Sequence, residues 1–130
     1  MLHEELTNKI IGAFFKVYNT LGYGFLEKVY ENAMKIELTR LGFDVEQQKS
    51  IKVFYGEHNV GDYFADLIVN DLVILELKAA DALCDEHEAQ LLNYLKATDK
   101  EVGLLFNFGK EAKFVRKVFS NENKKSAVIC

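Results

Sequence analysis

The most apolar stretch of this chain is interrupted by two charged residues. Residues 73–77 are apolar apart from Glu76, and Lys78 follows directly, a pattern that predicts a central β-strand. Because side chains alternate along a strand, Glu76 and Lys78 lie on one face of the predicted sheet. Burying a charge costs several kcal/mol unless the charge is paired or binds a metal ion. The alternatives are a structural salt bridge, a sheet edge or a metal site, and the cost of burial favours the metal site.

Asp66 poses the same question in the neighbouring predicted strand, residues 63–69. Asp66 and Glu76 share a face only in one register of the hairpin that joins the two strands. A two-residue loop at residues 70–71 would shift that register by one and send the carboxylates to opposite faces. The sequence therefore predicts a three-residue connection or a β-bulge, and bulges are common beside active sites.

The rest of the chain alternates between helical and strand-like patterns. Apolar residues recur every four positions from Leu6 to Tyr18, and Gly22 and Gly24 then break this first predicted helix. The elements predicted after it are a helix at about 26–41, strands at 45–55, 63–69 and 73–79, a helix from an Asp85 N-cap to near Thr98, and strands at 102–108 and 114–119, with a turn at 56–59. The order α-α-β-β-β-α-β-β predicts an α/β fold, a mixed sheet flanked by helices.

Length and composition suit a single domain. We expect one domain over residues 1–130, with its core at about 5–120 and a C-terminal tail at 121–130. No apolar run predicts a membrane helix, and the acidic start lacks the features of a signal peptide. Cys84 and Cys130 match no metal-binding spacing. They are predicted to be reduced thiols of a cytoplasmic protein, with a disulfide between them as the alternative.

The charge distribution limits how the chain could bind nucleic acid. A formal net charge of −4 argues against a protein that coats nucleic acid by bulk electrostatics. It does not exclude a nuclease, because a metal site concentrates carboxylates and its cations are not counted. Residues 110–125 are rich in lysine and arginine. They form either a face that holds phosphates or a solvated strand and tail.

Two carboxylates and a lysine on one sheet face are the groups that metal-assisted phosphodiester hydrolysis needs. Carboxylate oxygens hold magnesium, which keeps several of its waters. The metal lowers the pKa of a bound water and stabilises negative charge on the phosphate. A lysine can orient the attacking water and screen the developing charge.

The spacing of these residues resembles a known signature. Asp66 followed by Glu76-Leu77-Lys78 is similar to the D…(D/E)xK motif of the PD-(D/E)xK nuclease superfamily. Ala65 stands where that motif has proline, which is a common departure. The D…ExK pattern alone is a weak signal.

A second motif makes the resemblance more specific. Gly24, Glu27 and Tyr30 match the pattern of the GxxExxY proteins, a bacterial family placed in that superfamily. The resemblance runs from about residue 10 to residue 119. It implies a restriction-endonuclease-like fold and dependence on magnesium or manganese. The implied site residues are Asp66 and Glu76 as metal ligands, Lys78 as the catalytic lysine, Glu27 as a further acidic ligand, and Gln90 with Tyr94, which resemble the QxxxY motif of the exonuclease-like branch.

Two functions remain in view at the level of sequence. The first is a metal-dependent nuclease that acts on DNA. The second is a nucleic-acid-binding or regulatory module of the same fold with weak or lost catalysis. The small, acidic domain has little surface for gripping DNA, so a homodimer or a protein partner would supply the rest. On spacing alone, Glu27 and Gln90 could be exposed residues beside the core residues Tyr30 and Tyr94, and the resemblance favours the functional interpretation.

Overall fold

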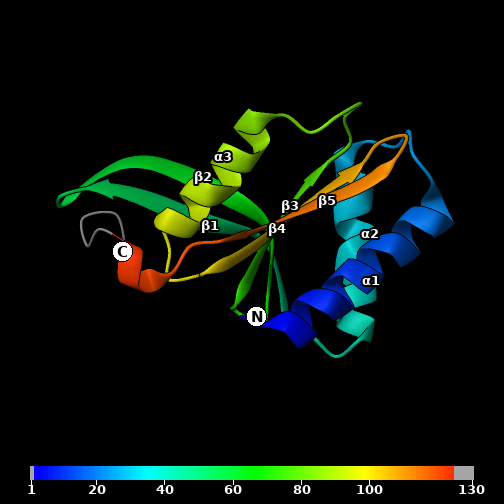
Figure 1. Cartoon of the computed structure of the whole chain (residues 1–130), viewed down its shortest axis with the longest axis horizontal. Coiled ribbons are helices and arrows are strands. Elements are labelled where there is room, and N and C mark those ends of the chain that lie inside the picture. Colours follow the sequence, from blue (N-terminus) through cyan, green and yellow to red (C-terminus); the bar gives the residue numbers. More distant parts are fainter. Residues whose placement is uncertain (1, 125–130) are drawn as a thin grey trace.

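The computed structural model describes residues 2–124, which form a five-stranded sheet between two layers of helix (Figure 1). The elements are α1 (Glu4–Leu21), α2 (Glu27–Arg40), β1 (Val45–Tyr55), β2 (His58–Val69), β3 (Val73–Lys78), α3 (Asp85–Lys96), β4 (Val102–Phe108), β5 (Ala112–Val118) and a short 3₁₀ helix (Asn121–Asn123). This order confirms the predicted α-α-β-β-β-α-β-β arrangement and the α/β fold class.

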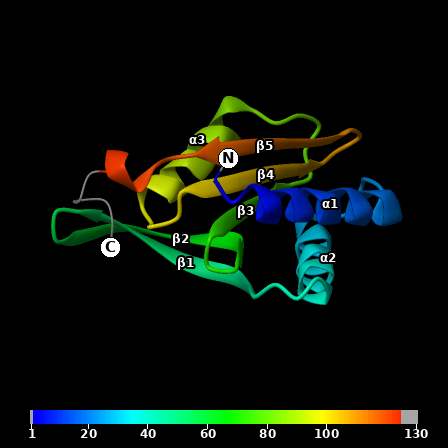
Figure 2. The same cartoon turned by 60° about the horizontal axis from the view of Figure 1, so that its bottom comes forward.

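The sheet is mixed, and its strands lie in sequence order. β1 with β2, β2 with β3, and β4 with β5 are antiparallel pairs, whereas β3 and β4 are parallel. A parallel pair requires a crossover, and α3 provides it. Figure 2 shows α1 and α2 on one face of the sheet and α3 on the other. β4 is buried at every position, which agrees with a sequence that is apolar apart from Asn107.

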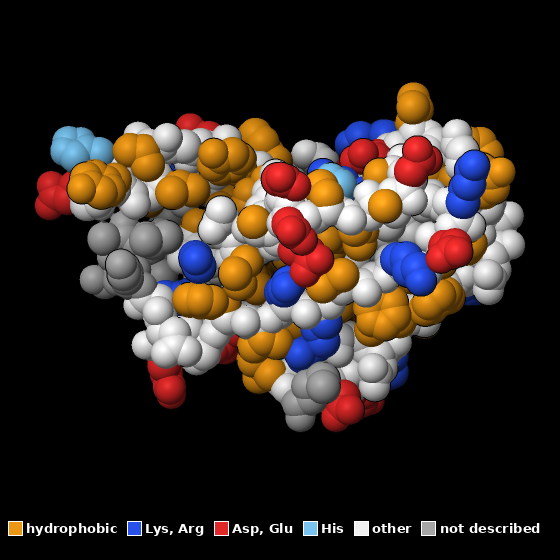
Figure 3. Space-filling model, turned by 45° about the horizontal axis from the view of Figure 1, so that its top comes forward, with side chains coloured by type: hydrophobic (Ala, Val, Ile, Leu, Met, Phe, Trp, Pro, Cys, Tyr) orange, Lys and Arg blue, Asp and Glu red, His pale blue; other side chains and the backbone are white. Residues whose placement is uncertain are grey.

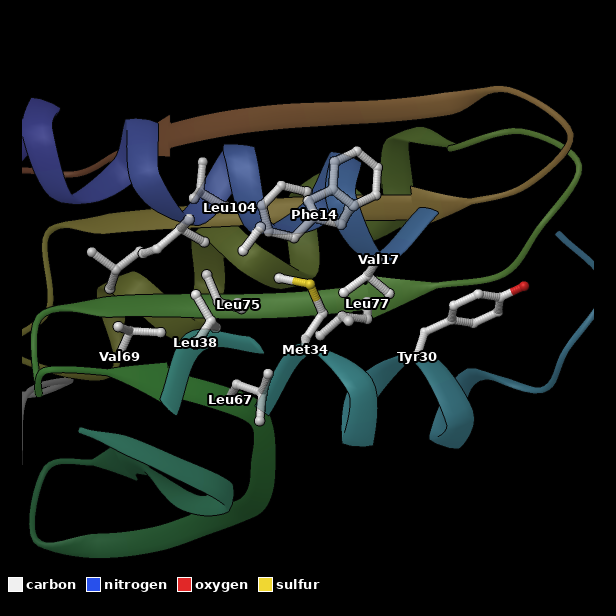
Figure 4. Packing of buried hydrophobic residues seen from close by; sticks show 14 of the residues in the cluster. Phe14, Val17, Tyr30, Met34, Leu38, Leu67, Val69, Leu75, Leu77 and Leu104 are labelled. Atoms are coloured by element: carbon white, nitrogen blue, oxygen red, sulfur yellow. The ribbon is translucent and has the colours of Figure 1, made fainter. Parts of the chain in front are cut away.

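The core beneath α1 and α2 is built around aromatic rings. Phe14 of α1 stacks on Phe106 with ring centroids 4.4 Å apart, and Tyr30 of α2 stacks on Phe108 at 4.3 Å. Figure 4 shows Phe14, Tyr30 and Met34 pointing from the two helices onto the sheet. No helix within residues 2–124 is long and apolar enough to cross a membrane.

Predicted boundaries were wrong at β2, at the start of α3 and at β5, which spans Ala112–Val118 instead of 114–119. β2 begins at His58, so the predicted turn at 56–59 is reduced to Gly56 and Glu57. The first half of β2 is largely exposed, and its polar residues therefore lack the alternation that marks a half-buried strand. α3 is capped by Cys84 rather than by Asp85. The Cys84 backbone N–H donates to His87 Nδ1 at 3.3 Å, and Asp85 is instead a first-turn residue that suits the helix dipole.

One of the two cysteines predicted to be reduced thiols lies within the described residues. Cys84 is exposed and free, whereas Cys130 lies outside the described residues. The predicted C-terminal tail is described only up to residue 124, and the 3₁₀ helix occupies its start.

Candidate metal site at the fork of the sheet

The hairpin between β2 and β3 has the register that the carboxylates require. Val69 pairs with Val73, so the connection is three residues long, as predicted. Asn70 and Asp71 adopt left-handed backbone conformations, with φ of 53° and 54°. Asparagine and aspartate tolerate this region better than most residues. The turn therefore places Asp66 and Glu76 across from each other.

Asp66 and Glu76 lie where β2 and β3 separate. Backbone pairing between the two strands ends at Leu67 and Leu75, after which β2 stays with β1 and β3 stays with β4. The Asp66 N–H donates to Glu76 Oε2 at 2.8 Å, and the Leu77 N–H donates to Asp66 Oδ2 at 2.8 Å. Each carboxylate thus replaces a ladder hydrogen bond at the point where β2 and β3 separate. We call this point, marked by Asp66 and Glu76, the fork of the sheet. Asp66 Oδ1 and Glu76 Oε1 are the oxygens that these backbone bonds leave for a ligand.

The fork is electrostatically costly without a cation. Burial raises the pKa of Glu76 to about 8, and the negative charge of Asp66 adds to the rise. The Asp66 N–H and the charge of Lys78 oppose it only in part. Burial also raises the pKa of Asp66, against the lowering effect of the Leu77 N–H. A bound cation would favour the ionised form of both groups.

Lys78 is held at the end of β3 by the chain that follows it. It is half-buried and lies beside Asn107 in the parallel register with β4. Asn107 is buried, accepts from the Ala80 N–H at 2.9 Å and donates to the Ala80 carbonyl at 3.0 Å. A Cβ at Gly109 would lie 2.3 Å from that carbonyl oxygen, so only glycine permits this close approach. Within residues 2–124 Lys78 forms no ion pair with Asp66 or Glu76, and it acts on them through its charge.

Two residues beside the carboxylates were missed by sequence reasoning. Glu31 of α2 is only 4% exposed, and it accepts from Gln48 Nε2 and from Lys28 Nζ, each at 2.9 Å. Gln48 lies in β1 with a φ of 53°, and its Nε2 also lies 3.4 Å from Asp66 Oδ1. Glu31 was detectable as the residue one turn after Glu27, on the same helix face. An exposed glutamine in a polar strand gave no signal.

The Gly24-Glu27-Tyr30 motif closes the turn between α1 and α2. Tyr30 is fully buried, its hydroxyl donates to the Gly22 carbonyl at 2.7 Å, and it accepts from the Phe25 N–H at 3.2 Å. Gly24 has a φ of 109°, a conformation that L side chains rarely adopt. Glu27 is exposed in the first turn of α2, one turn before Glu31.

Gln90 and Tyr94 are brought together on α3. Gln90 Nε2 donates to the Tyr94 hydroxyl at 2.6 Å. Burial raises the pKa of Tyr94, and the charges of Glu76 and Asp66 raise it further. The phenol therefore lies in the electric field of the two carboxylates, on the α3 side of the sheet.

The basic segment at 110–125 is largely engaged with neighbouring protein groups. Arg116 donates to the Leu2 carbonyl. The remaining contacts are Lys113 with Glu111 at 3.3 Å, Lys117 with Glu88 at 2.8 Å, and Lys124 Nζ with the Thr98 and Lys100 carbonyls at 2.9 and 2.6 Å. Lys125 lies outside the described residues. These contacts favour the structural alternative for this segment, in which its cations pair with neighbouring protein groups.

The donor set at the fork fits a hard divalent cation that keeps part of its water shell. No three histidine, cysteine, aspartate or glutamate side chains within residues 2–124 gather closely enough to hold an ion by themselves. Magnesium is usually bound through one or two carboxylates together with waters and substrate phosphates. Asp66 and Glu76 supply two such carboxylates, each fixed through one oxygen.

Comparison with known proteins agrees with this geometry. A family model described as the PD-(D/E)XK nuclease superfamily matches residues 4–118, a range that begins with α1 and ends with β5. Searches of curated proteins and of solved structures gave no match. The narrower assignment to the GxxExxY proteins stays a prediction. The chain belongs to the PD-(D/E)XK nuclease superfamily.

Proposed function

We propose that this protein is a magnesium- or manganese-dependent nuclease that hydrolyses phosphodiester bonds in DNA, with Asp66 and Glu76 as the metal ligands. The observation that carries the proposal is the fork of the sheet. There the carboxylates of Asp66 and Glu76 each accept a hydrogen bond from a backbone N–H of the other residue's strand, and the pKa of both carboxylates is raised. Carboxylates whose ionised form is costly without a cation and is stabilised by a bound cation are typical of a functional site.

Each residue of the site has a role that follows from its place. The bound cation would supply charge stabilisation at the phosphate and a water of lowered pKa. Asp66 and Glu76 would hold the cation at the fork. Lys78, at the end of the same strand, orients the attacking water and screens developing negative charge. Gln90 and Tyr94 contact the hydrated cation or the nucleic acid from α3.

Mutation of Glu27 and Glu31 can show which acidic residue of α2 contributes to the metal site. The resemblance assigns this role to Glu27, whereas Glu31 is the α2 carboxylate that reaches Asp66 through Gln48. We expect Glu31→Gln to weaken magnesium-dependent cleavage about tenfold, because outer-shell partners of metal ligands usually contribute 10- to 100-fold. We expect a smaller loss for Glu27→Gln, because Glu27 is exposed. Cleavage titrated against magnesium for both variants measures the difference, and a larger loss in Glu27→Gln would restore Glu27 as the ligand.

Cleavage of a mixed panel of labelled DNA and RNA tests the proposed function. The wild type is expected to cleave at least one substrate in magnesium or manganese and none in EDTA. Lys78→Ala is expected to lower the rate at least ~100-fold, because removing one electrostatic donor costs about 10²- to 10³-fold. Lys113→Ala is the matched control, since Lys113 is an exposed lysine paired with Glu111, and it should cleave as the wild type does.

The contrary result would point to the second function. A folded protein that is stabilised by magnesium but cleaves nothing on the panel would contradict the proposal. It would indicate a binding or regulatory module that keeps the metal site, or an enzyme whose site is completed by a partner.

A further inference from the structure

A groove runs between α3 and the hairpin formed by β1 and β2. Its volume is about 700 Å³, within the range of ligand-binding clefts. The hairpin contributes Val53, Val60 and Tyr63, and α3 contributes Gln90 and Tyr94 among others. Figure 1 shows α3 lying over this hairpin, which extends beyond the rest of the sheet. In Figure 3 hydrophobic side chains gather along the projecting lobe at the left.

The lining of the groove suits an uncharged, flat ligand better than a phosphate chain. Most of its exposed lining is apolar, with the side-chain amides of Gln90 and Asn93 as hydrogen-bonding groups. Of the described residues that line it, only Glu86 and Lys96 are charged, and they have opposite sign. The Lys96 ammonium also lies 5.6 Å from the centroid of the Phe119 ring. A groove that followed a nucleic-acid backbone would present several cations.

Tyr63 is a stacking surface held in place by the strand beneath it. Its side chain is 47% exposed although it points into the groove, and its ring centroid lies 5.8 Å from that of Tyr94. A Cβ at Gly61 would lie 3.0 Å from Tyr63 Cε2. The missing side chain of Gly61 therefore gives room to the ring of Tyr63, which stays about half exposed beside the groove.

Tyr94 relates the groove to the two carboxylates, because it lines the groove and its phenol lies in their electric field. This residue lines the groove, accepts a hydrogen bond from Gln90 and is subject to the charges of Glu76 and Asp66. A ligand in the groove would thus contact Tyr94, the groove residue that is influenced by the charges of the carboxylates.

We propose that this groove binds unpaired nucleobases, so that the substrate of the site is a single strand or a frayed end rather than an intact duplex. The inference rests on the proposed nuclease function for the position of the phosphate. Aromatic rings bind bases by stacking, which tolerates any sequence because every base has a π-face, and amides can hydrogen-bond to the exposed edges of unpaired bases. A paired duplex keeps its bases inside the helix, where Tyr63 could not stack on them.

Binding in EDTA separates this inference from catalysis. The probes are a fluorescently labelled single-stranded DNA, the RNA of the same sequence and the matching blunt duplex, each measured by anisotropy. We expect Tyr63→Ala to weaken single-strand binding about tenfold, since stacking on one aromatic ring contributes roughly 5- to 150-fold per base. Tyr63→Phe keeps the ring and should bind as the wild type does. Tyr55→Ala is the control, because Tyr55 is an exposed tyrosine of the same hairpin that does not line the groove.

The outcomes distinguish the groove from the nuclease. Unchanged single-strand binding in Tyr63→Ala, or binding of the duplex alone, contradicts the proposal that the groove binds unpaired bases. This holds even if the wild type cleaves DNA in magnesium. Absence of nucleic-acid binding by the wild type contradicts the proposal as well, and would direct attention to a protein ligand. Tyr63-dependent binding of single strands supports the groove even where no cleavage is found, and the relative affinity of the DNA and RNA probes then identifies the preferred strand.

Discussion

Replacing Glu76 with glutamine is expected to abolish cleavage and to stabilise the fold in the same protein. Glutamine keeps the shape of the side chain, and its Oε1 can still accept from the Asp66 N–H that now donates to Glu76 Oε2. The substitution removes an anionic ligand, and the cation supplies several kcal/mol of transition-state stabilisation. We therefore expect the cleavage rate to fall at least ~1,000-fold.

The stability gain comes from the cost that Glu76 imposes on the metal-free fold. Glu76 is 4% exposed, and its pKa is raised to about 8 by burial and by Asp66. The neutral glutamine carries no such cost. We expect the free energy of unfolding in EDTA at pH 7 to rise by about 2 kcal/mol, or roughly 7 °C in melting temperature.

Glu37 provides the matched control. It is also a buried glutamate, at 8% exposure, but it is paired with Lys16 at 2.6 Å and Arg40 at 3.7 Å. Glu37→Gln leaves these cations without their partner, so it should not stabilise the fold and should leave cleavage intact. Circular dichroism melts and the cleavage assay measure both effects. A destabilised or unfolded Glu76→Gln protein, or one that still cleaves, would show that Glu76 is structural.

The sequence was most informative where residue type and strand periodicity agreed. The apolar run around Glu76 predicted β3, and the run at β4 predicted its bounds without error. The requirement that Asp66 and Glu76 share a face predicted a three-residue connection or a β-bulge, and the register shows the three-residue connection. In each case one local rule, the alternation of side chains, decided the outcome.

The surroundings of the carboxylates depend on tertiary contacts that no local pattern contains. Glu31 and Gln48 meet because α2 packs beside β1, and Gln48 reaches Asp66 only through a left-handed backbone that its residue type does not favour. The groove has the same origin, since Tyr63 and Tyr94 come from elements that are separated in the sequence. A strand prediction places Tyr63 but not the helix that lies across from it.

The metal-free protein is expected to lose stability as the pH rises from 6 to 8. In the folded state the pKa of Glu76 is raised from 4.5 to about 8, so between these values the folded protein holds a proton that the unfolded chain has released. Stability falls with pH wherever the folded state binds more protons than the unfolded state. The raised pKa of Asp66 acts in the same direction. Glu76 alone should lower the free energy of unfolding by about 2 kcal/mol between pH 6 and pH 8.

Urea denaturation in EDTA at several pH values measures this slope, and Glu76→Gln is its internal control. The net charge of −4 also disfavours the fold at high pH, but it acts on both proteins, so the difference between them isolates the carboxylate. Magnesium should reverse the trend, because it binds the deprotonated carboxylates and its stabilisation of the fold therefore grows with pH. Parallel pH profiles for the wild type and Glu76→Gln would mean that Glu76 is ionised in the metal-free protein. A positive charge of the protein itself would then already neutralise the carboxylates.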